Sequence, residues 1–206
     1  MIRVSCAALC RIRHSDGRFL VGLNRNRLRH GERVLTPYGG ASTFDDSTVL
    51  RGLGVRFERD DVKDLRFLIE EDRIAEFEAW FRSRSGRESD PLRELAEELV
   101  TEENLLPQFD PDTLTVDYLG LVMTEAETSR GAVRGRLTRY YLEIFDVGLP
   151  DRLWRQLDGR LSKLDSTARL VTVDEIEAGQ GPDGIAIAST AAFLLRPGGS
   201  TSGMTS

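Results

Sequence analysis

One short acidic segment constrains the fold of this 206-residue chain more than any other feature. Asp90 and Pro91 are typical of the N-cap and first position of a helix, which is predicted to run to about Thr101. At about 100° per residue, its glutamates fall on one arc and its aliphatic residues on the opposite arc. The acidic arc holds Glu94, Glu97 and Glu98, and the aliphatic arc holds Leu92, Leu95, Ala96 and Leu99. The helix can therefore bury one side while three carboxylates converge on the other.

Three carboxylates on one helix face indicate a metal site. Glu94 and Glu98 stand four residues apart, where like charges cost an isolated helix roughly 0.2–0.5 kcal/mol. A hard divalent cation would remove this repulsion, and oxygen ligands suit Mg²⁺ or Mn²⁺. Arg93 precedes Glu97 by one turn and is expected to orient it by an ion pair. For this segment taken alone, a merely solvated acidic face is the alternative interpretation.

Charge and length exclude several classes of protein. The formal net charge of −6 and the pI near 5.1 argue against general nucleic-acid binding and against a membrane-surface protein. No apolar run approaches the length of a membrane span, and the apolar stretch in the first ten residues is too short and too interrupted to be expected as a signal peptide. Cys6 and Cys10 would lie about 13 Å apart on one strand face, too far for a disulfide. We expect buried thiols and a cytoplasmic protein.

Strands and helices mix along the chain without strict alternation, which predicts an α+β fold, an α/β/α sandwich. An Asp-Gly turn at 16–17 is typical of a hairpin between the first two strands. Predicted strands cover residues 2–13, 18–23, 34–40, 54–57, 64–69, 114–123, 138–147 and 169–173. Predicted helices cover residues 71–84, 90–101, 151–164 and 185–195. A single domain over 1–196 is expected, followed by a disordered tail over 197–206.

The acidic segment resembles the core of the Nudix box, Arg-Glu-aliphatic-X-Glu-Glu, over Arg93-Glu94-Leu95-Ala96-Glu97-Glu98. Pro37-Tyr38-Gly39-Gly40 is similar to the Pro-Gly-Gly turn that precedes the box in Nudix proteins, with Tyr38 as an extra residue. Residues 171–176 resemble a strand and helix start found late in that fold. The resemblance implies a mixed β-sheet flanked by helices. Three positions depart from the full box: Ala79 and Ser85 stand where it has Gly and Glu, and Val100 where it has Gly.

A narrower group, the SMODS-associated NUDIX domains, resembles the chain more fully. The shared residues are Gly39-Gly40-Ala41, Trp80-Phe81, and the run from Arg87 to Leu99 with Pro91 as its fifth residue. Residues 41–85 correspond to an insertion, with a strand and an amphipathic helix, placed before the box helix. That group is linked to bacterial anti-phage systems built around cyclic-oligonucleotide synthases. The resemblance therefore implies a nucleotide-derived small molecule and such a synthase system as partners, with a homodimer left open.

The family resemblance also implies roles for individual residues. The expected metal ligands for Mg²⁺ or Mn²⁺ are Glu94, Glu97, Glu98 and the carbonyl of Gly40. The expected catalytic residues are Arg93, Glu97 and Glu98. Arg25, Arg27 and Tyr38 are expected to bind substrate, the arginines at phosphate and the tyrosine on a base. A plain surface loop and plain packing are the respective alternatives.

Two functions remain open at this point. The first is a metal-dependent hydrolase of a pyrophosphate or phosphodiester bond in a nucleotide-linked substrate, with one box glutamate or a loop carboxylate, Glu125 or Glu127, as base. The second is a nucleotide-binding sensor that kept the fold and lost turnover. The intact glutamates favour the first function, and the missing glutamate at Ser85 favours the second.

Overall fold

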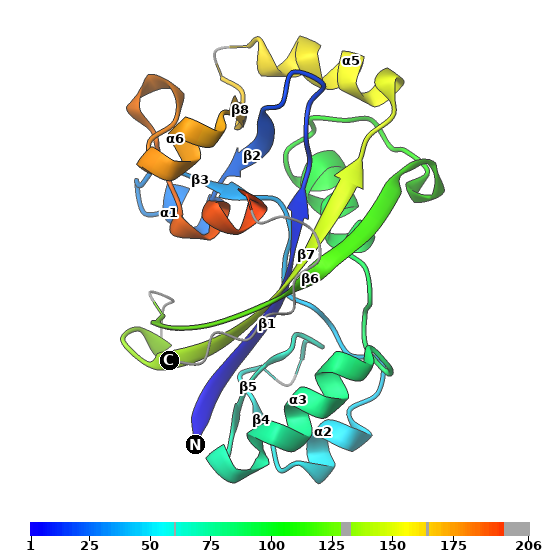
Figure 1. Ribbon diagram of the computed structural model, residues 1–206, viewed down its shortest axis with the longest axis vertical. Coiled ribbons are helices and arrows are strands. Elements are labelled where there is room, and N and C mark those ends of the chain that lie inside the picture. The colour runs from blue at the N-terminus through cyan, green and yellow to red at the C-terminus, as the bar shows by residue number, and fades with distance from the viewer. Residues whose placement is uncertain (60, 129–132, 164, 196–206) are drawn as a thin grey trace. The chain divides into compact units, whose positions relative to one another are not determined.

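The computed structural model describes residues 1–206 except 60, 129–132, 164 and 196–206 (Figure 1). The described chain forms two compact units. The first unit comprises Met1–Ala8, Gly40–Pro91 and Leu121–Glu143, and the second comprises Leu9–Gly39, Leu92–Gly120 and the chain from Ile144 onward. The predicted disordered tail lies outside the described residues, and the predicted single domain stays a prediction.

Two sheets and short helices make up the fold, which confirms the α+β prediction. One sheet has five strands in the order β4-β5-β1-β7-β6, and the other has four in the order β8-β2-β3-β9. The first contains β1 (Ile2–Arg11), β4 (Arg56–Phe57), β5 (Arg66–Ile69), β6 (Thr115–Glu127) and β7 (Leu137–Gly148). The second contains β2 (Phe19–Leu23), β3 (Val34–Pro37), β8 (Ala168–Val171) and β9 (Ala186–Ile187). The second sheet is mixed, because β3 pairs antiparallel with β2 and parallel with β9.

The helices are short and several are not α-helical. The α-helices are α1 (Arg25–Leu28), α2 (Thr48–Gly52), α3 (Ile74–Ser83), α4 (Leu92–Ala96), α5 (Asp151–Leu161) and α6 (Val173–Ala178). The 3₁₀ segments are η1 (Glu71–Arg73), η3 (Pro111–Thr113), η5 (Pro182–Gly184) and η6 (Ser189–Leu195). One π-helical segment, η2 (Glu97–Glu102), continues α4.

The first unit has an aromatic core built on the predicted amphipathic helix. Helix α3 buries Ile74, Phe77 and Phe81 on one face, which confirms the predicted amphipathic helix. Phe77 meets Phe67 of β5 and Tyr141 of β7 edge-on, with ring centroids 5.1 and 5.3 Å apart. Edge-to-face pairs of this kind add stability beyond the buried area. The helix lies beside β4 and β5 in Figure 1.

A buried ion pair closes this core where α3 ends. The guanidinium of Arg87 donates to both carboxylate oxygens of Glu143, at 2.8 and 2.9 Å, and the two side chains are 0% and 3% exposed. Arg87 also donates to the carbonyls of Phe81 and Glu88 and lies 3.9 Å over the Phe81 ring. The carboxylate of the adjacent Glu88 accepts instead from the backbone amide and the hydroxyl of Thr43.

The second unit packs α6 and η6 on the four-stranded sheet. Its core contains Val21, Leu35, Val171, Ile176 and Leu194. Thr172 and Glu175 form a reciprocal capping box at the start of α6, which satisfies two backbone donors. This arrangement confirms the predicted strand and helix start at 171–176.

Two predicted elements differ from the structure. The Asp-Gly turn does close, with Gly17 N donating to the carbonyl of His14 at 2.9 Å. The hairpin pairing is confirmed next to the turn, where Arg13 and Phe19 form an antiparallel bridge and the amide of Leu20 donates to the carbonyl of Ile12 at 2.9 Å. Beyond this point β1 and β2 enter different sheets, and β2 also pairs with β3 and β8. The predicted helix at 185–195 begins as β9, because Ile187 is paired with Leu35 on the free edge of β3, and only then becomes 3₁₀.

Candidate functional site

The box helix changes its winding where the paired glutamates begin. It is α-helical over Leu92–Ala96 and π-helical over Glu97–Glu102. The amide of Glu103 donates to the carbonyl of Glu98 at 2.9 Å, five residues back. Leu95 and Leu99 are fully buried, so the predicted apolar face is confirmed. The predicted regular α-helix to Thr101 is wrong in its second half; π turns of this kind are rare and often occur at functional sites.

The carboxylate of Glu98 is held by the turn that follows β3. Its Oε2 accepts a hydrogen bond of 2.7 Å from the backbone N–H of Gly39. Gly39 has φ +127°, a conformation that residues with a side chain rarely adopt. The two parts of the family resemblance in the second unit, the turn and the box, therefore meet at this bond.

Glu98 is a poorly stabilised anion in this setting. Burial, and to a lesser extent the neighbouring carboxylates of Glu103, Glu94 and Glu102, raise its pKa to about 8. The Gly39 N–H opposes this shift but does not cancel it. A cation close to Glu98 would reverse the effect, because it favours the charged form.

A pH dependence of stability follows from this shift. The folded chain retains a proton on Glu98 that the unfolded chain loses above its ordinary pKa of 4.5, so stability falls as pH rises from about 4.5 to 8. Without divalent metal, Glu98→Gln is expected to be more stable than the wild type by about 2 kcal/mol at pH 8.5. This is less than 1.36 kcal/mol per pKa unit would give, because the side chain is partly exposed. Urea unfolding with chelator at pH 4 and pH 8.5 measures the difference, and an equal difference at both pH values would contradict it.

A second carboxylate, Glu103, is tied to the same turn. The hydroxyl of Tyr38 donates to Glu103 Oε2 at 2.7 Å, and Thr167 donates to the same oxygen at 3.0 Å. Consecutive residues of the turn, Tyr38 and Gly39, therefore hold the two acids that close one π turn, Glu103 and Glu98. Burial raises the pKa of Glu103, although both hydroxyl donors lower it.

The predicted role of Tyr38 as a base-stacking residue is wrong. Only 2% of the residue is exposed, so neither face of the ring is open to a ligand. The ring covers Gly22 of β2, where an added Cβ would lie 2.8 Å from the ring. Tyr38, the residue that departs from Pro-Gly-Gly, is a packing and positioning residue.

Removing the hydroxyl of Tyr38 tests this role. Tyr38→Phe is expected to lower the free energy of unfolding by about 1.5–3 kcal/mol, because a hydrogen bond to a carboxylate is lost in a buried position. Urea unfolding at pH 7 measures it. Tyr140→Phe is the matched control, since the Tyr140 hydroxyl bonds to no residue that the structure describes, and it should change stability by less than about 0.5 kcal/mol. A similar loss in both variants would contradict the role.

Arg93 is paired with both of the remaining box acids. Its guanidinium lies 2.8 Å from Glu94 and 3.5 Å from Glu97. Glu97 is the more open, with 52% of its side chain exposed. Within the described ranges, no three His, Cys, Asp or Glu side chains form a group that could hold a metal ion. The three glutamates therefore lie on one helix, but their side chains do not converge as the helical periodicity predicted. Two of them, Glu94 and Glu97, form ion pairs with Arg93 instead.

The predicted phosphate-binding arginines lie on α1, which the sequence predicted as a loop. Arg25 contacts the end of η2, with Nη1 2.7 Å from the Glu102 carboxylate and Nη2 3.1 Å from the Glu102 carbonyl. Arg27 pairs instead with Glu32 at 3.1 Å. Each arginine side chain remains 46% exposed. Their role in substrate binding stays a prediction.

Two further predicted positions have other partners. The carbonyl of Gly40, in the first unit, accepts a hydrogen bond of 3.0 Å from Ala8, and its role as a metal ligand stays a prediction. Glu125 and Glu127 do not lie on a loop, because β6 extends to Glu127. Glu125 there accepts from Arg139 at 2.7 Å.

Glu103 is the residue that the sequence did not single out. In an α-helix it would point about 140° away from Glu98. The π turn places Glu103 directly above Glu98 along the helix axis. Only this change in winding brings the two residues to the same face of the helix. The Glu102-Glu103 pair directly after the box was the available signal.

These features define the class of the protein. A mixed sheet flanked by helices, with a glutamate-bearing helix bonded to a Gly-Gly turn, is the arrangement of a Nudix domain. The family described as "SMODS-associated NUDIX domain" matches residues 1–195, and the chain belongs to that family. A comparison with curated proteins found no match. In the part of the chain that the structure describes, no helix has the length and apolar character of a membrane span.

Proposed function

We propose that the chain is a metal-dependent hydrolase of a pyrophosphate or phosphodiester bond in a nucleotide-linked substrate. The observation that carries the proposal is the carboxylate of Glu98. Gly39 holds one oxygen in place, while burial and three neighbouring acids raise the pKa of the group to about 8. Among the described residues no cation pairs with this positioned carboxylate, and a bound metal ion would supply the missing positive charge.

The donor atoms fit a hard divalent cation. Glu94, Glu97 and Glu98 offer only carboxylate oxygens, which suit Mg²⁺ or Mn²⁺. When bound, the metal would neutralise phosphate charge and lower the pKa of a bound water. Glu94 would have to exchange its contact with Arg93 for the cation, whereas Glu97 contacts Arg93 through Oε2 and would keep that contact.

The chain's own residues would accept the proton, orient the base and bind the substrate phosphates. Glu97, the most exposed box acid, is proposed to accept the proton of the attacking water. The water oxygen bonds to phosphorus and the bridging P–O bond breaks. The phosphoryl product gains the hydroxyl group, and the leaving oxygen gains the proton. Arg93 is proposed to keep Glu97 oriented. Arg25 and Arg27 are proposed to bind the substrate phosphates through their exposed guanidinium groups.

The biological setting is proposed from family membership. We propose that the protein works in the cytoplasm beside a cyclic-oligonucleotide synthase in anti-phage signalling, because the family is described as SMODS-associated. A nucleotide-derived small molecule is the proposed ligand. A homodimer stays a prediction.

A nucleotide-binding sensor without turnover is the second candidate. Two observations favour it: Ser85 stands exposed where the full box has a glutamate, and no three-acid metal group is formed among the described residues.

Calorimetry with Mg²⁺ or Mn²⁺ alone is the first test. We expect the metal ion to bind at millimolar concentration, and the absence of binding would contradict the proposed metal site. A panel of linear and cyclic nucleotides with Mg²⁺ then tests for release of phosphate or mononucleotide. No turnover across the panel, together with thermal stabilisation by a nucleotide that Glu98→Gln leaves unchanged, would replace the hydrolase with the sensor.

A further inference from the structure

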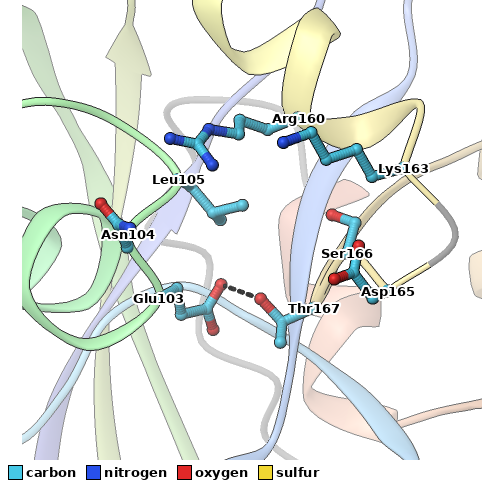
Figure 2. Close-up of a pocket in the computed structure, with 8 residues that line it drawn as sticks. All are labelled: Glu103, Asn104, Leu105, Arg160, Lys163, Asp165, Ser166 and Thr167. Atoms are coloured by element: carbon cyan, nitrogen blue, oxygen red, sulfur yellow. Dashed lines mark hydrogen bonds between the residues drawn. The ribbon is translucent and has the colours of Figure 1, made fainter.

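The second unit contains a hollow that the proposed hydrolase site does not use. Its volume is about 140 Å³, and Figure 2 shows its lining residues. Glu103 and Asn104 come from the loop after η2. Arg160 and Lys163 come from the end of α5 and the turn after it, and Asp165 and Thr167 come from the approach to β8.

Two cationic side chains stand on one side of the hollow. Arg160 and Lys163 are exposed, and both side chains extend toward Leu105 (Figure 2). Neither the guanidinium nor the ammonium group forms a hydrogen bond or ion pair with any residue that the structure describes. An Arg and a Lys side by side are suited to a phosphate group, with the guanidinium fork and the ammonium as donors.

Acceptors stand on the other side. Both protein donors to Glu103, from Tyr38 and Thr167, use Oε2, which leaves Oε1 without a donor among the described residues. Asp165 adds a second, exposed carboxylate. These acids would repel a bare phosphate placed next to them, but they accept hydrogen bonds from hydroxyl groups. A fitting ligand therefore carries an anion at one end and hydroxyls at the other.

The size of the hollow limits that ligand. A water molecule needs roughly 10–15 Å³ of such space, so 140 Å³ holds on the order of ten non-hydrogen atoms. This is enough for a phosphate and most of a pentose ring. We infer that the hollow binds the phosphorylated pentose of a nucleotide, with the phosphate on Arg160 and Lys163 and the sugar hydroxyls on Glu103 and Asp165. The site uses none of the box glutamates, so it does not depend on the proposed hydrolysis.

Calorimetry of the whole chain with chelator present tests the inference, because the chelator removes any contribution of a metal site. The probes are AMP, ribose 5-phosphate, inorganic phosphate and adenosine. We expect AMP and ribose 5-phosphate to bind. Arg160→Gln and Lys163→Gln should each weaken this binding about ten-fold or more, as expected for a hydrogen bond to a charged group. Both positions are exposed, so the variants should fold. Arg155→Gln, also exposed on α5, is the matched control and should bind as the wild type does.

The outcomes distinguish whether the ligand binds, whether it binds in the hollow, and whether its sugar is contacted. No binding of AMP or ribose 5-phosphate at millimolar concentration would overturn the inference. Equal weakening by Arg155→Gln would overturn the location, since it would show general charge attraction. Inorganic phosphate binding as tightly as ribose 5-phosphate would overturn the sugar contacts, whereas a ten-fold preference for ribose 5-phosphate that Asp165→Asn removes would support them.

Discussion

Replacing Glu98 by Gln is expected to lower nucleotide hydrolysis about a thousand-fold. The substitution removes the charge on the one box carboxylate that the Gly39 N–H holds in place. A metal contributes several kcal/mol of transition-state stabilisation, and each 1.36 kcal/mol corresponds to a factor of ten in rate. Release of mononucleotide in millimolar Mg²⁺, measured as kcat/KM, gives the result.

The control for this prediction is Glu177→Gln on α6, an exposed acid outside the site, which should retain full activity. The stability of Glu98→Gln is a second control. Because the variant is expected to be more stable than the wild type above neutral pH when no divalent metal is present, unfolding of the variant would not explain its inactivity. A kcat/KM within ten-fold of the wild type would remove Glu98 from the proposed mechanism.

The largest expected effect on stability is at Glu143. Glu143→Gln should lower the free energy of unfolding by about 3–5 kcal/mol, because it leaves the charge of the fully buried Arg87 without its counterion. Urea unfolding at pH 7 measures the loss. Glu125→Gln is the control, since its pair with Arg139 is exposed and should contribute less than about 1 kcal/mol.

A double substitution distinguishes the contribution of the ion pair from that of the other hydrogen bonds of Arg87. Arg87→Met with Glu143→Leu removes both charges, and replacing a buried pair by apolar residues is often neutral or stabilising. We expect the double variant to recover most of the loss of Glu143→Gln. A double variant that is no more stable than the single one would show that the bonds from Arg87 to the Phe81 and Glu88 carbonyls dominate instead.

Features set by neighbours in the sequence were predictable. The spacing of Ile74, Phe77 and Phe81 placed α3 and its buried face correctly. The family resemblance over residues 171–176 indicated the start of α6, where the structure shows Thr172 and Glu175 forming a capping box. The glutamates, Arg93 and the Gly-Gly turn indicated the family, which the match over residues 1–195 confirms. All of these depend on helical periodicity or on contacts within one turn, so a single stretch of chain contains the information.

The tertiary structure alone decided how these parts meet. The sequence shows that Tyr38 precedes the glycines, but only the fold brings its hydroxyl to Glu103, 65 positions away. The π turn that aligns Glu103 with Glu98 violates the regular winding on which any helical wheel depends. Likewise, the choice of Glu143 as the partner of Arg87 joins residues 56 positions apart. Local periodicity determines which face of a helix is buried, whereas the partner of each polar group is determined by which distant segments the core packs together.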